Sequence, residues 1–315
     1  MIRAICLNPA IDRTYYIDGY VPGRPYRQIQ PKVDVGGKGI NAAKVCAQLG
    51  EPVACYGFIG CENGEKVLRT LKDYGIENHF LSVDGETRTT VNIIDHEKGR
   101  ESEIIEPGPH VSEAQAQALL DELEKGLTAG DVVLCSGISA RGVWKDVYVR
   151  ISQMCGDVGA KCILDTNGAN LLDSLRGHYL MIKPNARELT EICGQKQTDD
   201  VEALIDMART LLPVSDYILV SMGGDGGLLV HADDAWMIRV PQVDTVSTIG
   251  SGDSTVAGFA VGFSRGCPME EVVRLAMACG TANALTNSVG LLKRDALESI
   301  LNQIHIQPIA YAQCV

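Results

Sequence analysis

Short apolar runs that alternate with amphipathic stretches limit most strongly how this chain can fold. Residues 112–127 and 201–212 have the 3.6-residue periodicity of helices that bury one face. Five apolar runs around them have the length and composition of buried strands: residues 53–59, 132–135, 161–164, 179–182 and 217–220. Strands and helices alternate in this way when helices cover a mainly parallel sheet. The pattern therefore predicts an α/β fold.

Two stretches break this alternation. Residues 13–35 and 86–110 form partly polar, alternating segments interrupted by Gly19, Pro22 and Gly99, a pattern typical of antiparallel hairpins. We expect them to form a small separate sheet. The chain has no internal repeat or long linker, so this sheet would be inserted in one core domain, made of residues 1–12, 36–85 and 111–315.

Charge and composition exclude several classes of partner. The 315 residues include 40 acidic and 28 basic side chains, a net charge of −12, which argues against binding to nucleic acid or to an anionic membrane. An anionic substrate would then need local basic groups. The candidates are Arg24, Arg27, Lys32, Lys38 and Arg88.

The cysteines and the absence of apolar spans bear on location. Eleven cysteines are scattered without a C-x-x-C pair, and several lie inside apolar runs, which favours reduced, buried thiols. No targeting segment and no run of about 20 apolar residues is visible. We therefore expect a soluble, cytoplasmic protein.

A glycine-rich run near the C-terminus is the strongest candidate for chemistry. Residues 247–258 place Asp253 among Gly250, Gly252 and Gly258, just before an apolar stretch that reads as a helix. At such a helix start, the free N–H groups of residues 250–253 would converge on one point and hold an anion. A carboxylate beside them suits phosphoryl transfer, with Asp253 as base and Gly250, Ser251 and Gly252 as anion-binding residues. The alternative is a glycine turn with Asp253 as a helix cap.

Five motifs in order resemble those of the phosphofructokinase B (ribokinase-like) family of sugar kinases. They are residues 8–12 (NPAID), 36–43 (GGKGINAA), 183–188 (KPNARE), 221–227 (SMGGDGG) and 247–258. The resemblance spans nearly the whole chain. It implies a ribokinase-like three-layer αβα core with a mainly parallel sheet, and a small β-sheet lid over the sugar site. Lids of this family often pack against the lid of a second subunit, which suggests a homodimer.

The resemblance also implies a set of sugar-site residues. By this resemblance, Asp12 accepts hydrogen bonds from sugar hydroxyls, and the glycines of residues 36–39 let the backbone approach the sugar. Lys38 and Arg88 bind a phosphate that the sugar already carries. The open alternatives are an Asx turn for Asp12, a strand-to-helix turn for the glycines, and solvated surface charges for Lys38 and Arg88. The full set of substrate residues is Asp12, Gly36, Gly37, Lys38, Asn41, Arg88, Ser136 and Arg27.

For the nucleotide, the resemblance implies ATP with Mg²⁺. No Walker A sequence is present, so ATP would not bind through a P-loop. Glu188 and Asp165 would lie near the metal, although Glu188 could be an ordinary first-turn helix residue and residues 223–227 a tight hairpin. The nucleotide residues would be Lys183, Asn185, Ser221, Gly223, Gly226, Thr248 and Asn283.

The motifs are most similar to the branch of the family that phosphorylates sugar phosphates, which includes 1-phosphofructokinase and tagatose-6-phosphate kinase. Fructose 1-phosphate is the favoured substrate, followed by tagatose 6-phosphate or fructose 6-phosphate. The chain departs from the branch at residues 138–142, where Arg141 could contact phosphate or face solvent. A kinase of an unphosphorylated sugar or nucleoside, and a non-catalytic sugar-phosphate sensor, are the other hypotheses.

Overall fold

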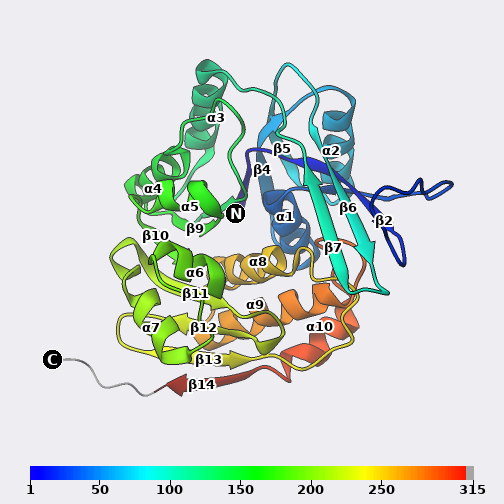
Figure 1. Cartoon of the computed structure of the whole chain (residues 1–315). Helices are drawn as coiled ribbons and strands as arrows, with labels where there is room; N and C mark the ends of the chain where they lie inside the picture. The colour runs from blue at the N-terminus through cyan, green and yellow to red at the C-terminus, as the bar shows by residue number, and fades with distance from the viewer. Residues whose placement is uncertain (310–315) are drawn as a thin grey trace.

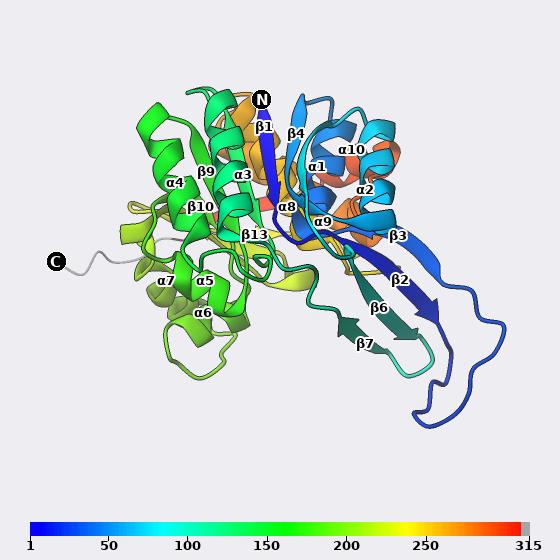
Figure 2. The same cartoon turned by 90° about the horizontal axis from the view of Figure 1, so that it is seen from above.

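A ten-stranded sheet runs through the molecule, and a four-stranded sheet projects from one side of it (Figures 1 and 2). The computed structural model describes residues 1–309. In spatial order the strands of the large sheet are β14 (His305–Ile309), β13 (Ala235–Arg239), β12 (Gly227–Val230), β11 (Ser215–Ser221), β10 (Tyr179–Ile182), β9 (Lys161–Asp165), β8 (Val132–Ser136), β1 (Ile2–Cys6), β4 (Val53–Ile59) and β5 (Glu77–Ser82).

The strands from β11 to β5 are parallel, and β12, β13 and β14 extend the sheet with antiparallel pairs. A parallel strand covered on both faces is apolar throughout rather than alternating, and all seven residues of β4 are buried. The five predicted apolar runs are all strands of this sheet. The prediction of a mainly parallel sheet is confirmed.

Helices cover both faces of the large sheet. Alternate residues of β1 separate two apolar clusters, since Ile2 and Ala4 face one and Ile5 faces the other. The first cluster contains side chains of α1 (Lys38–Gln48), α2 (Cys61–Asp73), α8 (Ser251–Ser264), α9 (Met269–Ala284) and α10 (Arg294–Leu301). The second contains side chains of α3 (Glu113–Gly126), α4 (Val147–Val158), α5 (Gly168–Ser174), α6 (Ala186–Ile192) and α7 (Val201–Arg209). The three-layer core is confirmed.

The helix boundaries follow local chemistry. Ser112 caps α3 through a reciprocal capping box with Gln115. The helix predicted over 201–212 ends at Arg209 and is followed by a 3₁₀ turn over Leu212–Val214. Pro213 has no N–H to donate to the carbonyl of Arg209, four residues earlier, so α-helical hydrogen bonding cannot continue there. The prediction was therefore too long by three residues at this end.

The small sheet, called the lid sheet below, combines two hairpins that are distant in sequence. Its order is β3 (Lys32–Gly36), β2 (Ala10–Tyr16), β6 (Arg88–Asp95) and β7 (Arg100–Ile105). The predicted antiparallel pairing holds within each hairpin, and parallel pairing of β2 with β6 joins them. Because β2 begins at Ala10, Asp12 lies inside a lid strand and not before it. Figure 2 shows this sheet extending away from the core.

Helices α8 and α9 pack unusually closely because glycines face the contact. A methyl group at Gly258 would lie 2.4 Å from Ala276 Cα, and one at Gly280 would lie 2.2 Å from Thr255 Oγ1. Cβ atoms do not lie this close to other heavy atoms in close-packed proteins. The glycines thus fix the position of α8, and with it the position of the glycine-rich run at its start.

Within residues 1–309, no helix is long and apolar enough to cross a membrane. The ten cysteines in this range are all free, and seven of them are buried. Cys314 lies outside the described residues.

Replacing Gly258 tests the close packing of the two helices. Gly258→Ala should lower the free energy of unfolding by about 1–3 kcal/mol because the methyl group overpacks the contact. The matched control is Gly156→Ala in α4, where a methyl group would meet nothing within 4 Å, and the better helix propensity of alanine should raise stability by about 0.5–1 kcal/mol. Denaturant unfolding measures both. Equal effects from the two substitutions would contradict the packing argument.

Candidate active site

Two cavities meet at the start of α8. One, of about 260 Å³, lies between the lid sheet and the core and is called the polar cavity. The other, of about 350 Å³, lies against β11, η2 (Gly223–Asp225) and α9 and, as the larger of these two, is called the large cavity. Gly250 and Asp253 line the polar cavity, while Ser251 and Gly252 line the large one. The predicted anion-binding run is thus the partition between the cavities.

The backbone at this partition is arranged by Gly250. Its φ of 79° is left-handed, and a methyl group on it would lie 2.4 Å from Val289 Cγ1, so only glycine fits. The N–H of Ser251 donates to the carbonyl of Thr248 at 3.2 Å. Those of Gly250, Gly252 and Asp253 have no partner in the described part of the chain. Three of the four predicted N–H groups are therefore available to an anion, and that of Ser251 is not.

Asp253 is buried and is held by Asn41. Its side chain accepts a hydrogen bond from Asn41 Nδ2 at 2.8 Å, and only 6% of the residue is exposed. Burial raises the pKa of Asp253, against the opposing effect of the Lys38 ammonium. Asn41 Oδ1 is buried without a partner among residues 1–309. Asn41 lines the polar cavity, and its NH₂ group has a second N–H besides the one donated to Asp253, so its side chain keeps both a donor and an acceptor.

A second buried carboxylate, Asp165, lies at the end of β9 between two lysines. Lys183 Nζ is 3.1 Å from Asp165 Oδ1, and Lys38 Nζ is 3.4 Å from both carboxylate oxygens. Burial opposes ionisation, but the two ammonium groups outweigh it and lower the pKa of Asp165. The carboxylates of Asp165, Asp253 and Glu188 in turn raise the pKa of Lys38 despite its burial. Lys38 therefore stays charged beside the partition.

Asp12 and Arg88 enter the polar cavity from paired lid strands. Burial raises the pKa of Asp12 to about 6, although a hydrogen bond with Thr90 and the charge of Arg88 lower it. A methyl group at Gly36 would lie 1.9 Å from Asp12 Oδ2. Gly36 therefore makes room for the Asp12 carboxylate and does not itself line the cavity.

The next glycines also have packing roles. Gly37 has a φ of 104° and would place a methyl group 2.8 Å from Cys6 Sγ, whereas one at Gly39 would lie 2.5 Å from the carbonyl oxygen of Ile5. The glycines form the turn into α1, and Gly37 also lines the polar cavity. Their approach to a sugar stays a prediction.

Of the remaining residues predicted for the sugar site, some line the polar cavity and others lie away from it. Ser136, at the end of β8, is buried and lines the polar cavity. Arg27 is exposed in the loop between β2 and β3, and the structure does not bring it to either cavity. Arg141 is likewise exposed and lines neither. Glu103 and Ile105 of β7 line the polar cavity but were not predicted, because β7 reads in sequence only as a polar, exposed hairpin strand.

The large cavity collects most of the predicted nucleotide residues. Asn185, Ser221, Gly223, Gly226 and Thr248 line it. Sequence reasoning missed its far wall, formed by residues 240–243 and 245 and by one face of α9, namely Met277, Gly280, Thr281 and Ala284. Helical spacing of small and apolar residues on α9 is indistinguishable in sequence from an ordinary core face.

Two predicted nucleotide residues lie behind the cavities. Lys183 lies under the partition, since a methyl group on Gly252 would be 3.3 Å from its Nζ. Asn283 is buried and donates to the carbonyl of Ile249 at 2.9 Å. Both residues support the start of α8 from the protein side.

The candidate metal residues do not form a preformed metal site. Asn185 and Glu188 make a capping box at the start of α6, with hydrogen bonds of 2.8 and 2.9 Å. Asp165 forms ion pairs with Lys38 and Lys183. Among residues 1–309 no group of three His, Cys, Asp or Glu side chains could hold a metal ion. Mg²⁺ often binds through one or two carboxylates plus substrate phosphates and water, and Glu188 retains one uncommitted oxygen for this.

Comparison with known proteins agrees with this geometry. The chain is 31% identical over 309 residues to tagatose-6-phosphate kinase from Staphylococcus epidermidis, covering 97% of this chain and 99% of the relative. The structure of a candidate phosphofructokinase from Staphylococcus aureus matches with a TM-score of 0.82 at 32% identity, covering 98% and 99% of the two chains. A candidate 1-phosphofructokinase from Thermotoga maritima, 23% identical, shares the fold with a TM-score of 0.85 over 98% and 100% of the chains.

Residues 6–294 match the pfkB family of carbohydrate kinases. The match spans most of the chain and includes all five motifs as well as both cavities. The chain therefore belongs to the pfkB family of carbohydrate kinases, enzymes that transfer a phosphoryl group to an alcohol acceptor.

Proposed function

We propose that the protein phosphorylates a ketohexose monophosphate to a bisphosphate with ATP. The observation that carries this proposal is the partition of residues 250–253. It puts a buried carboxylate, and N–H groups without a partner among residues 1–309, between the polar cavity and a second cavity of about 350 Å³. Cavities of this size hold small ligands. ATP would occupy the large cavity, and the sugar would occupy the polar one.

In the proposed reaction, Asp253 accepts the proton of the attacking hydroxyl. That oxygen forms a bond to the γ-phosphorus while the bond from phosphorus to the leaving ADP oxygen breaks. The raised pKa of Asp253 makes it a better base, whereas the lysines keep Asp165 ionised. The N–H groups of Gly250, Gly252 and Asp253 would stabilise the charge on the transferred group. Asn41 would hold Asp253 in place.

Mg²⁺, bound with ATP, would offset phosphate charge. We propose that Glu188 contacts it through water, because one of its oxygens already caps α6. Asp165 would act through Lys38 and Lys183 rather than as a direct ligand, because both ammonium groups already hold its oxygens.

We further propose different roles for the two basic residues of the polar cavity. Lys38 forms an ion pair with Asp165, and the charge of Asp253 helps to raise the pKa of Lys38. Its ammonium would therefore contact the transferred phosphoryl group. Arg88 donates to the backbone carbonyl of Asn8 at 3.2 Å and more weakly to that of Glu106. Its other donors remain for the phosphate already on the sugar.

Two ketohexose monophosphates are candidates. The sequence motifs favour fructose 1-phosphate, and the 31% identical relative is a tagatose-6-phosphate kinase. ADP release should be measured with MgATP and fructose 1-phosphate, tagatose 6-phosphate, fructose 6-phosphate, fructose, ribose or adenosine. The highest kcat/KM with a phosphorylated ketohexose supports the proposal. Turnover only with an uncharged acceptor contradicts it, and binding without ADP release would indicate a sensor.

We propose that residues 13–35 and 86–110 act as the lid, with the other segments as core, in a cytoplasmic homodimer. The free, mostly buried cysteines favour a reducing compartment. Val33 and Ile104 on the lid sheet are 52% and 61% exposed. Large exposed apolar side chains gathered on one element often mark an interface.

Asp253→Asn removes the base while keeping shape. It should lower kcat by about 10²–10⁴-fold with little change in KM, because proton transfer is lost and binding is not. Steady-state kinetics checks this, with Asp295→Asn on exposed α10 as the control that should change neither. A fall of only a few-fold would remove Asp253 from the role of base.

Arg88 and Lys38 should differ in which kinetic constant they affect. Arg88→Met should raise KM for the sugar phosphate by about 10-fold or more with a smaller change in kcat, since it removes ground-state binding, whereas Lys38→Met should mainly lower kcat. Arg100→Met on β7 is the control, because Arg100 is exposed and lines neither cavity. The reverse pattern would exchange the two roles.

The dimer is tested by charge on the lid. Val33→Asp with Ile104→Asp should convert a dimer into the 33.9 kDa monomer in sedimentation velocity, because burying two carboxylates at the contact is costly. Val158→Asp on α4, which is 39% exposed, should leave the dimer intact. A wild-type protein that sediments as a monomer would refute the proposal.

A further inference from the structure

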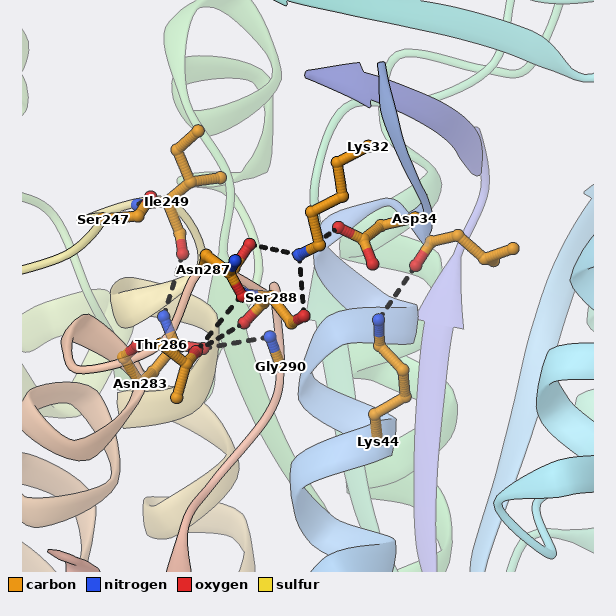
Figure 3. Close-up of polar contacts among 11 residues, drawn as sticks. Lys32, Asp34, Lys44, Ser247, Ile249, Asn283, Thr286, Asn287, Ser288 and Gly290 are labelled. Atoms are coloured by element: carbon orange, nitrogen blue, oxygen red, sulfur yellow. Dashed lines mark hydrogen bonds and ion pairs between the residues drawn. The ribbon is translucent and has the colours of Figure 1, made fainter. Parts of the chain in front are cut away.

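Lys32 connects the lid sheet to the core at a loop that no sequence motif singled out. It lies at the start of β3, and its Nζ donates to the backbone carbonyl of Asn287 and, at 2.7 Å, to Ser288 Oγ. Asp34 on the same strand holds the ammonium at 2.9 Å. Figure 3 shows this lysine reaching from the lid strand to the loop over residues 286–290. The lid and the core therefore share a charged contact outside both cavities.

The 286–290 loop is tied internally to Asn283 at the end of α9. The hydroxyl of Thr286 lies 2.8 Å from the carbonyl oxygen of Ser288 and 3.0 Å from that of Asn283. The N–H of Gly290 donates to Asn283 Oδ1 at 3.0 Å. Movement of the loop would therefore disturb Asn283.

Asn283 in turn holds the start of α8. The same side chain whose Oδ1 binds the loop uses Nδ2 to donate to the carbonyl of Ile249 at 2.9 Å, and lies 3.5 Å from Ser251 Oγ. Ile249 precedes Gly250, the residue that sets the partition. A continuous series of polar contacts thus runs from Lys32 through the loop and Asn283 to the carbonyl of Ile249, the residue before Gly250 (Figure 3).

A second lysine strengthens the same junction from the core side. Lys44 of α1 is 4% exposed and donates to the carbonyl of Val35 in β3 at 2.9 Å. Its Cε packs beside Gly290, where an added methyl group would lie 3.1 Å away. Strand β3 is therefore attached to the core on two sides of the same loop, which makes the loop sensitive to the position of the lid.

We propose that Lys32 is a positioning residue that couples the lid to the partition of residues 250–253. When the lid lies over the sugar, the Lys32 ammonium fixes the 286–290 loop, and the loop fixes the N–H groups that receive the transferred phosphoryl group. Lys32 itself lines neither cavity. The inference rests on the proposed function for its kinetic effect, whereas the contact itself can be tested without substrate.

The test compares Lys32 of the lid sheet with Lys98 in the turn between β6 and β7. Lys32→Met should lower kcat for the sugar phosphate by about 10-fold, the effect of losing a charge-assisted hydrogen bond that aligns the partition. Lys32→Arg should restore most of the activity, because it keeps the charge. The control is Lys98→Met, since Lys98 donates at 3.3 Å to the carbonyl of Tyr20, a contact that stays within the lid. Its kcat should match that of the wild type.

Hydrogen exchange supplies a readout independent of turnover. Amides of residues 286–290 and 250–253 should exchange faster in Lys32→Met than in the wild type or in Lys98→Met, with no sugar or nucleotide present. Unchanged exchange overturns the proposal. So does a rise in KM alone with kcat unchanged, which is the behaviour of a simple lid anchor. If the wild type phosphorylates no sugar phosphate, the proposed function is refuted. The hydrogen-exchange result then still tests whether Lys32 couples the lid to residues 286–290 and 250–253.

Discussion

The close contact between α8 and α9 is the constraint on which the candidate site depends. Gly258 and Gly280 remove the side chains that would keep these helices apart, so the first turn of α8 is set against the rigid face of α9. One short backbone segment can then face two cavities at once. A bulkier contact would shift this turn relative to the sheet, and neither the free N–H groups nor Asp253 would keep their places between the cavities.

Two buried carboxylates near this turn have pKa values shifted in opposite directions. Asp165 and Asp253 are both buried, yet two lysines lower the pKa of the first while burial raises that of the second. Lys38 and Lys183 form ion pairs with Asp165. Their positive charges therefore lie near the partition, while the hydrogen-bond partner of Asp253 is the neutral Asn41. Divergent environments for neighbouring carboxylates are a frequent basis for separating a base from a structural anion.

The sequence was sufficient for features whose signal is local. Apolar runs predicted the strands, and the glycine-rich run predicted where α8 begins. The sequence could not predict side-chain contacts between residues that the fold brings together from distant segments. Lys38 lies 127 residues from Asp165 in the chain, so their ion pair could not be predicted from the motif, and neither could the hydrogen bond from Asn41 to Asp253. The α9 wall of the large cavity could not be predicted, because Met277 and Thr281 have the spacing of a core face.

The parallel pairing of β2 with β6 has a consequence for how the protein folds. Residues 10–16 pair with residues 88–94, and β3, α1, β4, α2 and β5 lie between them in the chain. Each hairpin alone has two strands, which are marginally stable in water, and joining them requires closing a long loop before any contact is gained. The core must therefore assemble first and bring the two hairpins together. We therefore expect the lid sheet to form last and to be lost first, so the polar cavity that it lines can disappear while the core remains folded.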